Sequence, residues 1–316
     1  MWYFCGITII MGNDKKTSEL HPNNKHNKGY NFTELCEAYQ PLKAFVFVNA
    51  YGTATIDFAN QKAVKSLNTA LLFKHYQVKF WDFPDDNLCP PIPGRVDYIH
   101  YLADLLKASG IMENAKVLDI GTGANCIYPL LGNAVYGWQF TGTDIDAKSL
   151  EVAGLIVETN KLNHVIKLKQ QELSTQVLKG ILDESNKFSA AMCNPPFYGS
   201  QEEAMMANTR KLTGLGNEND ANLRNFGGKQ QELWHKGGEK AFLHTYLYES
   251  SMFKTQCFWY SSLVSKKENV EGMCDSLKKL NATDIKIIPM HQGNKITRIV
   301  AWTFLTEQEQ KDWKQE

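Results

Sequence analysis

The chain has 316 residues, of which 43% are hydrophobic and 22% charged, a composition that excludes a disordered protein. Its 34 basic and 34 acidic residues balance, which excludes a strongly basic nucleic-acid binder but leaves local basic patches open. The seven cysteines form no C-x-x-C pair, so we expect neither zinc nor a disulfide framework, and a reducing cytoplasm is favoured. No apolar run reaches the roughly 18 residues of a membrane span, so no membrane association is expected.

The first residues are interpreted as an arm. Residues 1–11 are apolar but lack the basic start and the small-residue cleavage site of a signal peptide, and Met11 is an alternative first residue. The polar stretch 12–31 is rich in Asn, Lys and His. This composition fits a loose or wrapping arm as well as it fits a solvated tail.

Residues 32–81 are expected to be mostly helical, because apolar residues recur at helical spacing in 63–76. The proline-dense stretch 83–95 then predicts a connector, since proline lacks the N–H that helices and sheets use. We place a domain boundary there. Residues 1–93 are expected to form an N-terminal arm and helical extension, and residues 94–316 a second domain.

The second domain shows strands alternating with helices, which is typical of a parallel α/β sheet. Strands are predicted at 116–120, 139–146, 165–170, 187–194, 257–265, 284–290 and 298–305. Helices are predicted at 97–110, 149–162 and 267–280. An inserted loop at 199–240 is long, polar and rich in Gly and Asn, and loops of that length are usually functional.

The segment VLDIGTGANC contains a pattern typical of nucleotide-binding turns. A strand carrying Asp119 breaks into Gly121 and Gly123, and such glycines let the backbone approach a ligand at the carboxyl edge of a sheet. An ordinary tight turn is the alternative. The third glycine of the dinucleotide fingerprint is missing near Cys126, which counts against a nicotinamide or flavin enzyme.

Asp144 strengthens the nucleotide interpretation. It ends the next strand, about twenty residues after the glycines, which is the spacing of a carboxylate that accepts ribose hydroxyls. Asp146 lies close by and competes for that role. Its alternative role is to cap the helix that follows.

The segment Asn194-Pro195-Pro196-Phe197 follows the fourth strand and predicts a stiff, extended turn. A side-chain amide held beside an adenosine-type ligand suggests S-adenosylmethionine as methyl donor and a planar amine as acceptor. The Asn194 side-chain oxygen and the Pro195 carbonyl can each accept one amine hydrogen, and Phe197 can stack on a flipped base. An incidental double-proline turn is the alternative.

Together these motifs resemble the amino-group methyltransferases, and more closely the ribosomal RNA large subunit methyltransferase F family of adenine-N6 methyltransferases. That family includes a bacterial 23S rRNA enzyme and the catalytic domain of a eukaryotic U6 snRNA relative. The resemblance covers residues 20–305. The matching segments are LHPNNKH, YGTATIDFAN, LCPPIPGRVDYIHYLADLL, LDIGTGANCIYPLLG, YGWQFTGTDID, CNPPFYGSQEEA, NFGGKQQELWHKGGE and RIVAWTF.

The resemblance implies an α/β, Rossmann-like class I S-adenosylmethionine-dependent methyltransferase with a mostly helical N-terminal extension that binds RNA. It implies that the Asn194–Phe197 turn holds the adenine. The implied cofactor-binding residues are Arg95, Asp119, Gly121, Gly123, Asp144, Ser174 and Asn194. Arg95 is similar to the arginine that reaches the methionine carboxylate. The chain ends soon after the catalytic domain, which disfavours the snRNA role.

The implied partner is 23S ribosomal RNA or a large-subunit assembly intermediate, bound by a monomer. Candidates for phosphate contacts are Lys25, His26, Lys28, Arg210, Lys211 and Lys229, although each is equally explained as a solvated surface charge. Phe226 and Trp234 can stack on bases or anchor the loop. His100 and His244 are interpreted as structural. The rival functions are methylation of a protein glutamine amide, which uses a similar turn, and a non-catalytic RNA-binding module.

Overall fold

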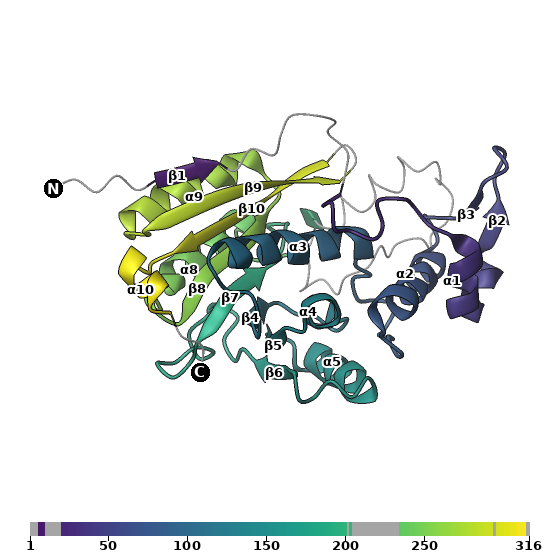
Figure 1. Cartoon of the computed structure of the whole chain (residues 1–316), viewed down its shortest axis with the longest axis horizontal. Helices are drawn as coiled ribbons and strands as arrows, with labels where there is room; N and C mark the ends of the chain where they lie inside the picture. Colours follow the sequence, from purple (N-terminus) through teal and green to yellow (C-terminus); the bar gives the residue numbers. More distant parts are fainter. Residues whose placement is uncertain (1–5, 10–19, 201, 204–233, 293–294, 314–316) are drawn as a thin grey trace.

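The computed structural model of the chain describes residues 6–9, 20–200, 202–203, 234–292 and 295–313. Within these residues one eight-stranded sheet has the order β1-β9-β10-β8-β7-β4-β5-β6 (Figure 1). Its strands are β1 (Gly6–Ile9), β4 (Lys116–Ile120), β5 (Gln139–Asp144), β6 (Ile166–Gln170), β7 (Phe188–Cys193), β8 (Cys257–Val264), β9 (Asp284–Gln292) and β10 (Lys295–Thr303). All seven strands predicted for the second domain are present.

The sheet is covered by helices on both faces. One face carries α3 (Ile92–Ala108), α4 (Ile127–Tyr136) and α5 (Ala147–Thr159), and the other carries α8 (Gly238–Ser250) and α9 (Lys267–Lys279) (Figure 1). Alternation along β4 produces this arrangement: Val117 packs into the α3–α4–α5 core, and Leu118 into the α8–α9 core. The short helix α10 (Glu307–Lys311) follows the last strand. The α/β class is confirmed.

Strand direction divides the sheet into two halves. β4, β5, β6, β7 and β8 run parallel, whereas β10 is antiparallel to both β8 and β9. Helices connect β4 to β5, β5 to β6 and β7 to β8, as parallel crossovers usually do, whereas residues 171–187 connect β6 to β7 without a helix. The carboxyl edge of this parallel half is therefore where a ligand site is expected.

Helix α3 begins earlier than predicted. It starts at Ile92 instead of residue 97, so the proline-rich connector ends at Pro91 and Arg95 lies inside the helix. Pro93 is tolerated there because the N–H groups of a helix's first turn have no intrahelical partner to lose. The prediction erred by treating each proline in the stretch as a break.

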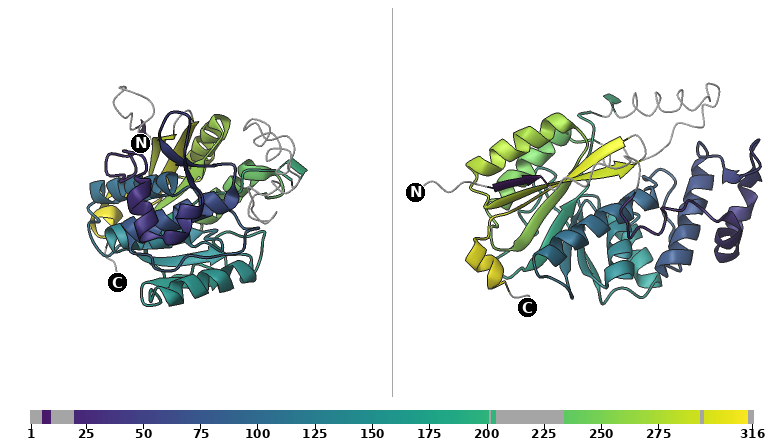
Figure 2. Two further views of the ribbon diagram at one scale, coloured as in Figure 1. Left: turned by 90° about the vertical axis from the view of Figure 1, so that its right-hand side faces the viewer. Right: turned by 45° about the horizontal axis from the view of Figure 1, so that its top comes forward.

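The N-terminal residues contain helices α1 (Phe32–Ala38) and α2 (Gln61–Tyr76), a 3₁₀ turn η1 (Gln40–Ala44), and an unpredicted hairpin of β2 (Val46–Val48) and β3 (Ala54–Ile56) (Figure 2). β1 pairs in parallel with β9 at the edge of the main sheet. One buried core extends from Leu71 of α2 through Leu102 of α3 to Leu131 of α4. The domain boundary after residue 93 stays a prediction, with apolar packing continuous across it.

Residues 20–31 wrap against α2 and α3, as expected of an arm. The carboxylate of Asp97 on α3 accepts bonds from the backbone N–H of His21 and the side-chain amide of Asn24, at 3.0 and 2.5 Å. His26 bonds the Tyr76 hydroxyl of α2 at 2.8 Å. These buried polar contacts fix the arm, since each group would be costly to bury alone.

We predict that His26 makes folding stability sensitive to mild acid. Burial, followed by the nearby His75 and Lys25, lowers the pKa of His26 from 6.5 to about 4. The unfolded chain therefore takes up a proton between these values that the folded chain does not, so stability is lost as the pH falls. From pH 7 to pH 5 the wild type should lose about 2 kcal/mol through this residue.

Urea denaturation measures the free energy of unfolding of the wild type and of His26→Gln at pH 7 and at pH 5. The difference between the two proteins should be smaller at pH 5 than at pH 7. His164→Gln, at an exposed position, serves as the control. A difference that is the same at pH 7 and pH 5 would contradict the prediction.

Candidate active site

Strand register brings the three predicted motifs to one edge of the sheet. Ile120 of β4 pairs with Thr143 of β5 on one side and with Cys193 of β7 on the other. The next residues along these strands, Gly121, Asp144 and Asn194, are therefore level with one another. Residues more than 70 positions apart in the sequence thus meet at the carboxyl ends of parallel strands.

The turn after β4 is fixed by backbone conformation and hydrogen bonds. Gly121 has a φ of +75°, a left-handed conformation that side chains with a Cβ rarely adopt. The N–H groups of Gly121 and Thr122 both donate to the Thr143 carbonyl at 2.9 Å. The backbone N–H of Gly123 donates to the Asp144 carboxylate at 2.9 Å. The glycine turn and the acid at the end of β5 therefore form one unit.

Asp144 and Asp146 have different roles. Each carboxylate oxygen of Asp144 accepts one backbone N–H, from Gly123 and from Asp146, which leaves further lone pairs for a ligand's hydroxyls. Burial raises the pKa of Asp144. Asp146 is the N-cap of α5, accepting the Lys148 N–H at 3.1 Å and the Ser149 hydroxyl at 2.9 Å. The capping role of Asp146 is present, and Asp146 also lines the pocket beside Asp144.

Asp119 lies below the pocket surface instead of lining it. Its carboxylate is buried, and burial raises its pKa to about 7. A hydrogen bond from the Thr122 hydroxyl opposes this rise in pKa, and the Arg95 guanidinium opposes it less strongly. Arg95 itself lines the pocket and donates to the Tyr128 hydroxyl at 2.9 Å. Asp119 therefore acts on the pocket through its charge and through Arg95.

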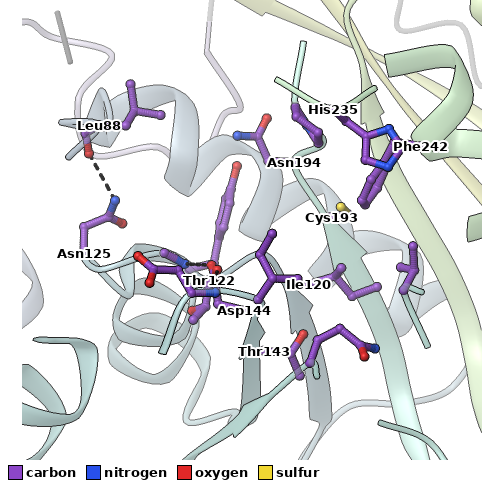
Figure 3. A pocket seen from close by; sticks show the side chains of 18 of the residues that line it. Leu88, Ile120, Thr122, Asn125, Thr143, Asp144, Cys193, Asn194, His235 and Phe242 are labelled. Atoms are coloured by element: carbon purple, nitrogen blue, oxygen red, sulfur yellow. Dashed lines mark hydrogen bonds between the residues drawn. The ribbon is translucent and has the colours of Figure 1, made fainter. Parts of the chain in front are cut away.

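One pocket collects most of the predicted residues (Figure 3). Those lining it are Arg95, Gly121, Gly123, Asp144, Ser174, Asn194 and Pro196; Pro195 and Phe197 lie in the same turn but do not line it. The side-chain oxygen of Asn194 is buried and has no partner in the described part of the chain. A buried oxygen without a partner lowers stability by about 1–3 kcal/mol, so we expect a ligand to donate a hydrogen bond to it.

Sequence reasoning missed the wall formed by the proline-rich connector. Leu88 and Pro90 line the pocket, and the Leu88 carbonyl accepts the Asn125 side-chain amide at 3.1 Å. Asn125 also caps the glycine turn by accepting the Ile127 N–H, and its carbonyl accepts the Trp81 indole N–H. The signal was available in the turn GTGANC, where an asparagine follows the glycines.

The loop after β6 supplies another unpredicted wall, formed by Gln171, Gln176 and Val177 beside the predicted Ser174. Its position depends on Glu249 of α8, a buried residue. One Glu249 carboxylate oxygen accepts three consecutive backbone N–H groups, those of residues 177, 178 and 179, at 3.0, 2.6 and 2.9 Å. Charge-assisted bonds of this kind hold the loop against the sheet edge.

Trp234, His235 and Phe242 also line the pocket, and Figure 3 shows His235 and Phe242 next to each other. Trp234 forms a parallel bridge with Tyr198, and the His235 N–H donates to the Tyr198 carbonyl at 3.0 Å. The end of the 199–240 insertion therefore returns to the residue that follows the Asn-Pro-Pro-Phe turn. Trp234 had been predicted as a base stacker or a loop anchor, and it lines the pocket.

The predicted RNA-contact residues fall into three groups. Lys25 and Lys28 are exposed on the arm. His26 is 5% exposed and is neutral at pH 7, because burial lowers its pKa to about 4. The structure thus corrects this prediction, since a buried neutral imidazole is no phosphate-binding cation. Arg210, Lys211 and Lys229, with Phe226, lie outside the described residues. Among the described residues, no helix is long and apolar enough to cross a membrane.

An open α/β sheet with a glycine turn, an acid ending the second strand and an Asn-Pro-Pro-Phe turn defines an S-adenosylmethionine-dependent methyltransferase of the Rossmann-like type. Residues 14–306 match a family described as RNA methyltransferase, and the chain belongs to that family. The fold class and the enzyme class expected from the sequence are therefore confirmed.

Curated relatives extend over nearly the whole chain. A protein of Pectobacterium carotovorum subsp. carotovorum, called Ribosomal RNA large subunit methyltransferase F, is 48% identical over 300 residues, covering 94% of this chain and 96% of that protein. A protein of the same name from Flavobacterium psychrophilum is 47% identical over 304 residues, covering 94% of this chain and 97% of that protein.

Solved structures agree with these relatives. The hMettl16 catalytic domain in complex with MAT2A 3′UTR hairpin 1 superposes with a TM-score of 0.79 at 30% identity, covering 92% of this chain and 97% of that domain. The N-terminal domain of human METTL16 in complex with SAH gives a TM-score of 0.73 at 27% identity, covering 92% of this chain and 100% of that domain. S-adenosylmethionine is accordingly the methyl donor of this class.

Asp144 and Asp146 form a matched pair for testing the cofactor site. Asp144→Ala should lower the affinity for S-adenosylhomocysteine about tenfold to a hundredfold, because it removes a charged acceptor together with the bond to Gly123. Asp146→Ala should lower folding stability by about 1 kcal/mol through loss of the cap, and because Asp146 also lines the pocket its loss of affinity should be present but smaller than that of Asp144→Ala.

Titration calorimetry measures the two affinities, and thermal unfolding measures the two stabilities. Equal losses of affinity in both variants would contradict the assignment of Asp144 to the ribose.

Proposed function

We propose that this protein transfers a methyl group from S-adenosylmethionine to the N6 amine of one adenine in the 23S rRNA of the large ribosomal subunit. The observation that carries the proposal is the Asn194 side-chain oxygen, which is buried, unpaired within the described residues, and on the pocket that also holds Asp144 and Gly121. The names of the bacterial relatives support rRNA as the substrate.

The proposed methyl transfer mainly requires that the adenine N6 amine and the methyl group of the donor are held in the right orientation. The donor supplies an electrophilic sulfonium methyl group, whereas the N6 lone pair of adenine is delocalised into the ring and is a weak nucleophile. Asn194 and the Pro195 carbonyl each accept one N6 hydrogen, which aims the lone pair towards the methyl group. Phe197 stacks on the base. Catalysis then comes from orientation and from fixed dipoles in a water-poor pocket.

The remaining pocket residues hold the donor. Asp144 accepts the ribose hydroxyls, and the glycine turn lets the adenosine lie close to the backbone. Arg95 pairs with the methionine carboxylate, and Ser174 contacts the adenosine ring. Buried Asp119, whose pKa is raised to about 7, stands below Arg95's end of the pocket and favours a cationic group when it is ionised.

RNA binding is assigned to the N-terminal extension and to the 199–240 insertion. Lys25 and Lys28 are exposed on the arm, where each can neutralise a phosphate. The substrate is naked 23S rRNA or an assembly intermediate, and the cytoplasm is where such a substrate is found in bacteria. The enzyme acts as a monomer in this proposal.

Methyl transfer from labelled S-adenosylmethionine to large-subunit rRNA that lacks the modification tests the proposal. The wild type should produce N6-methyladenosine at a single site. Asn194→Ala should reduce the rate at least 100-fold, comparable to the loss of a preorganised hydrogen-bonding group in other active sites. Its affinity for S-adenosylhomocysteine should stay within a few-fold of the wild type's.

Label on a protein glutamine instead of RNA would move the Asn-Pro-Pro turn from a base to an amide and overturn the proposal. RNA binding by the wild type without any methyl transfer would favour the non-catalytic alternative. Nucleoside analysis and mapping of the modified position distinguish these outcomes.

A further inference from the structure

Two polar ring atoms on the pocket wall have no role in the mechanism described above. The Trp234 indole Nε1 and the His235 Nδ1 are both buried, and neither has a hydrogen-bond partner among the residues described. Both residues line the pocket that Asn194 lines. Together with the Asn194 side-chain oxygen and the Arg95 Nε they make four unpaired polar groups around one cavity, as far as the described residues show. Such a concentration indicates that partners arrive with a ligand.

Backbone contacts hold Trp234 close to the Asn-Pro-Pro-Phe turn. Its bridge to Tyr198 places it beside the residue that directly follows Phe197. The two glycines after His235-Lys236 suit this turn: Gly237 and Gly238 have φ values of +86° and +69°, which residues with a Cβ rarely adopt, and a Cβ on Gly237 would lie 2.7 Å from the Ala241 Cβ. The Gly238 N–H also donates to the His235 carbonyl at 2.7 Å. The position of Trp234 is therefore specified, not incidental.

We propose that the Trp234 indole N–H donates a hydrogen bond to the adenine ring nitrogen next to the N6 amine, and so excludes guanine and uracil from the site. This inference rests on the proposed transfer to an adenine. An indole N–H is a donor only, and the Asn194 oxygen is an acceptor only. The two groups together match an amine donor with a neighbouring ring-nitrogen acceptor, an edge that adenine and cytosine present and that guanine and uracil lack.

The same pair of groups rejects guanine and uracil. Guanine presents a carbonyl oxygen and a ring N–H on its corresponding Watson–Crick edge, so both partners would be of the wrong kind. A site whose buried polar groups are left unpaired by the wrong substrate discriminates strongly against it. Trp234 therefore is a specificity residue, whereas Asn194 acts on the reacting amine.

The test uses a synthetic RNA fragment containing the adenine mapped in the methylation assay, and two versions with 1-deazaadenine or 7-deazaadenine at that position. Each analogue replaces one of the two ring nitrogens that flank N6 with a carbon. Trp234→Phe keeps a large aromatic ring and removes only the donor. Activity of the wild type on the adenine fragment establishes the proposed function before the specificity is examined.

The wild type should lose about tenfold in kcat/KM on one analogue, the value of one hydrogen bond, and that analogue identifies the nitrogen. Trp234→Phe should lose about tenfold on adenine and be insensitive to the same analogue. Trp313→Phe is the matched control, since the Trp313 indole N–H is also buried and unpaired in the described structure but lies outside the pocket. It should retain the wild-type response.

Equal sensitivity of the wild type and Trp234→Phe to each analogue would overturn the proposal, because the effects of the nitrogen and the indole would then be independent. A wild type that uses both analogues as well as adenine would overturn it without any variant. Binding of S-adenosylhomocysteine by Trp234→Phe verifies that the variant is folded.

Discussion

The pairing of β4 with β5 and β7 is the constraint on which the site depends. Because Ile120 faces Thr143 and Cys193 in the two ladders, the residues after them emerge together. A slip of one residue in either pairing would turn the alternating side chains to the opposite face of the sheet. It would also separate the glycine turn from Asp144, whose hydrogen bond links the two strands. Hydrophobic packing on both faces of the sheet is what prevents such a slip.

The residues that support the pocket have their hydrogen bonds made, whereas several polar groups that face into it do not. Its supports are fully bonded, as in the three N–H groups held by Glu249 and the cap made by Asp146. The groups at its surface include the Asn194 oxygen and the Trp234 indole N–H, both unpaired within the described chain. Rigid surroundings keep these groups from finding partners of their own, so their interaction energy remains available for ligands.

The sequence predicted what depends on short-range patterns. Apolar strands, helix spacing and the residues that end each strand were sufficient for Gly121, Asp144 and Asn194, because parallel strands place their carboxyl ends together. It did not predict contacts between distant segments that carry no local signal. The connector wall at Leu88, the return of Trp234 to Tyr198 and the pairing of β1 with β9 are of that kind. The prediction that His26 contacts phosphate was wrong for a related reason, because the polar composition of residues 12–31 does not indicate which of their side chains are buried.

The bridge between Tyr198 and Trp234 also makes the position of the catalytic turn independent of the length of the segment between these two residues. The 35 intervening residues begin and end at one backbone contact, so the catalytic turn is anchored whatever the chain does between these two points. Lengthening a loop whose ends are already joined costs little, about 0.6 kcal/mol for each doubling of its length. The length of the segment between Tyr198 and Trp234 can therefore change at little cost to the catalytic turn, because the backbone contact that closes this segment stays in place.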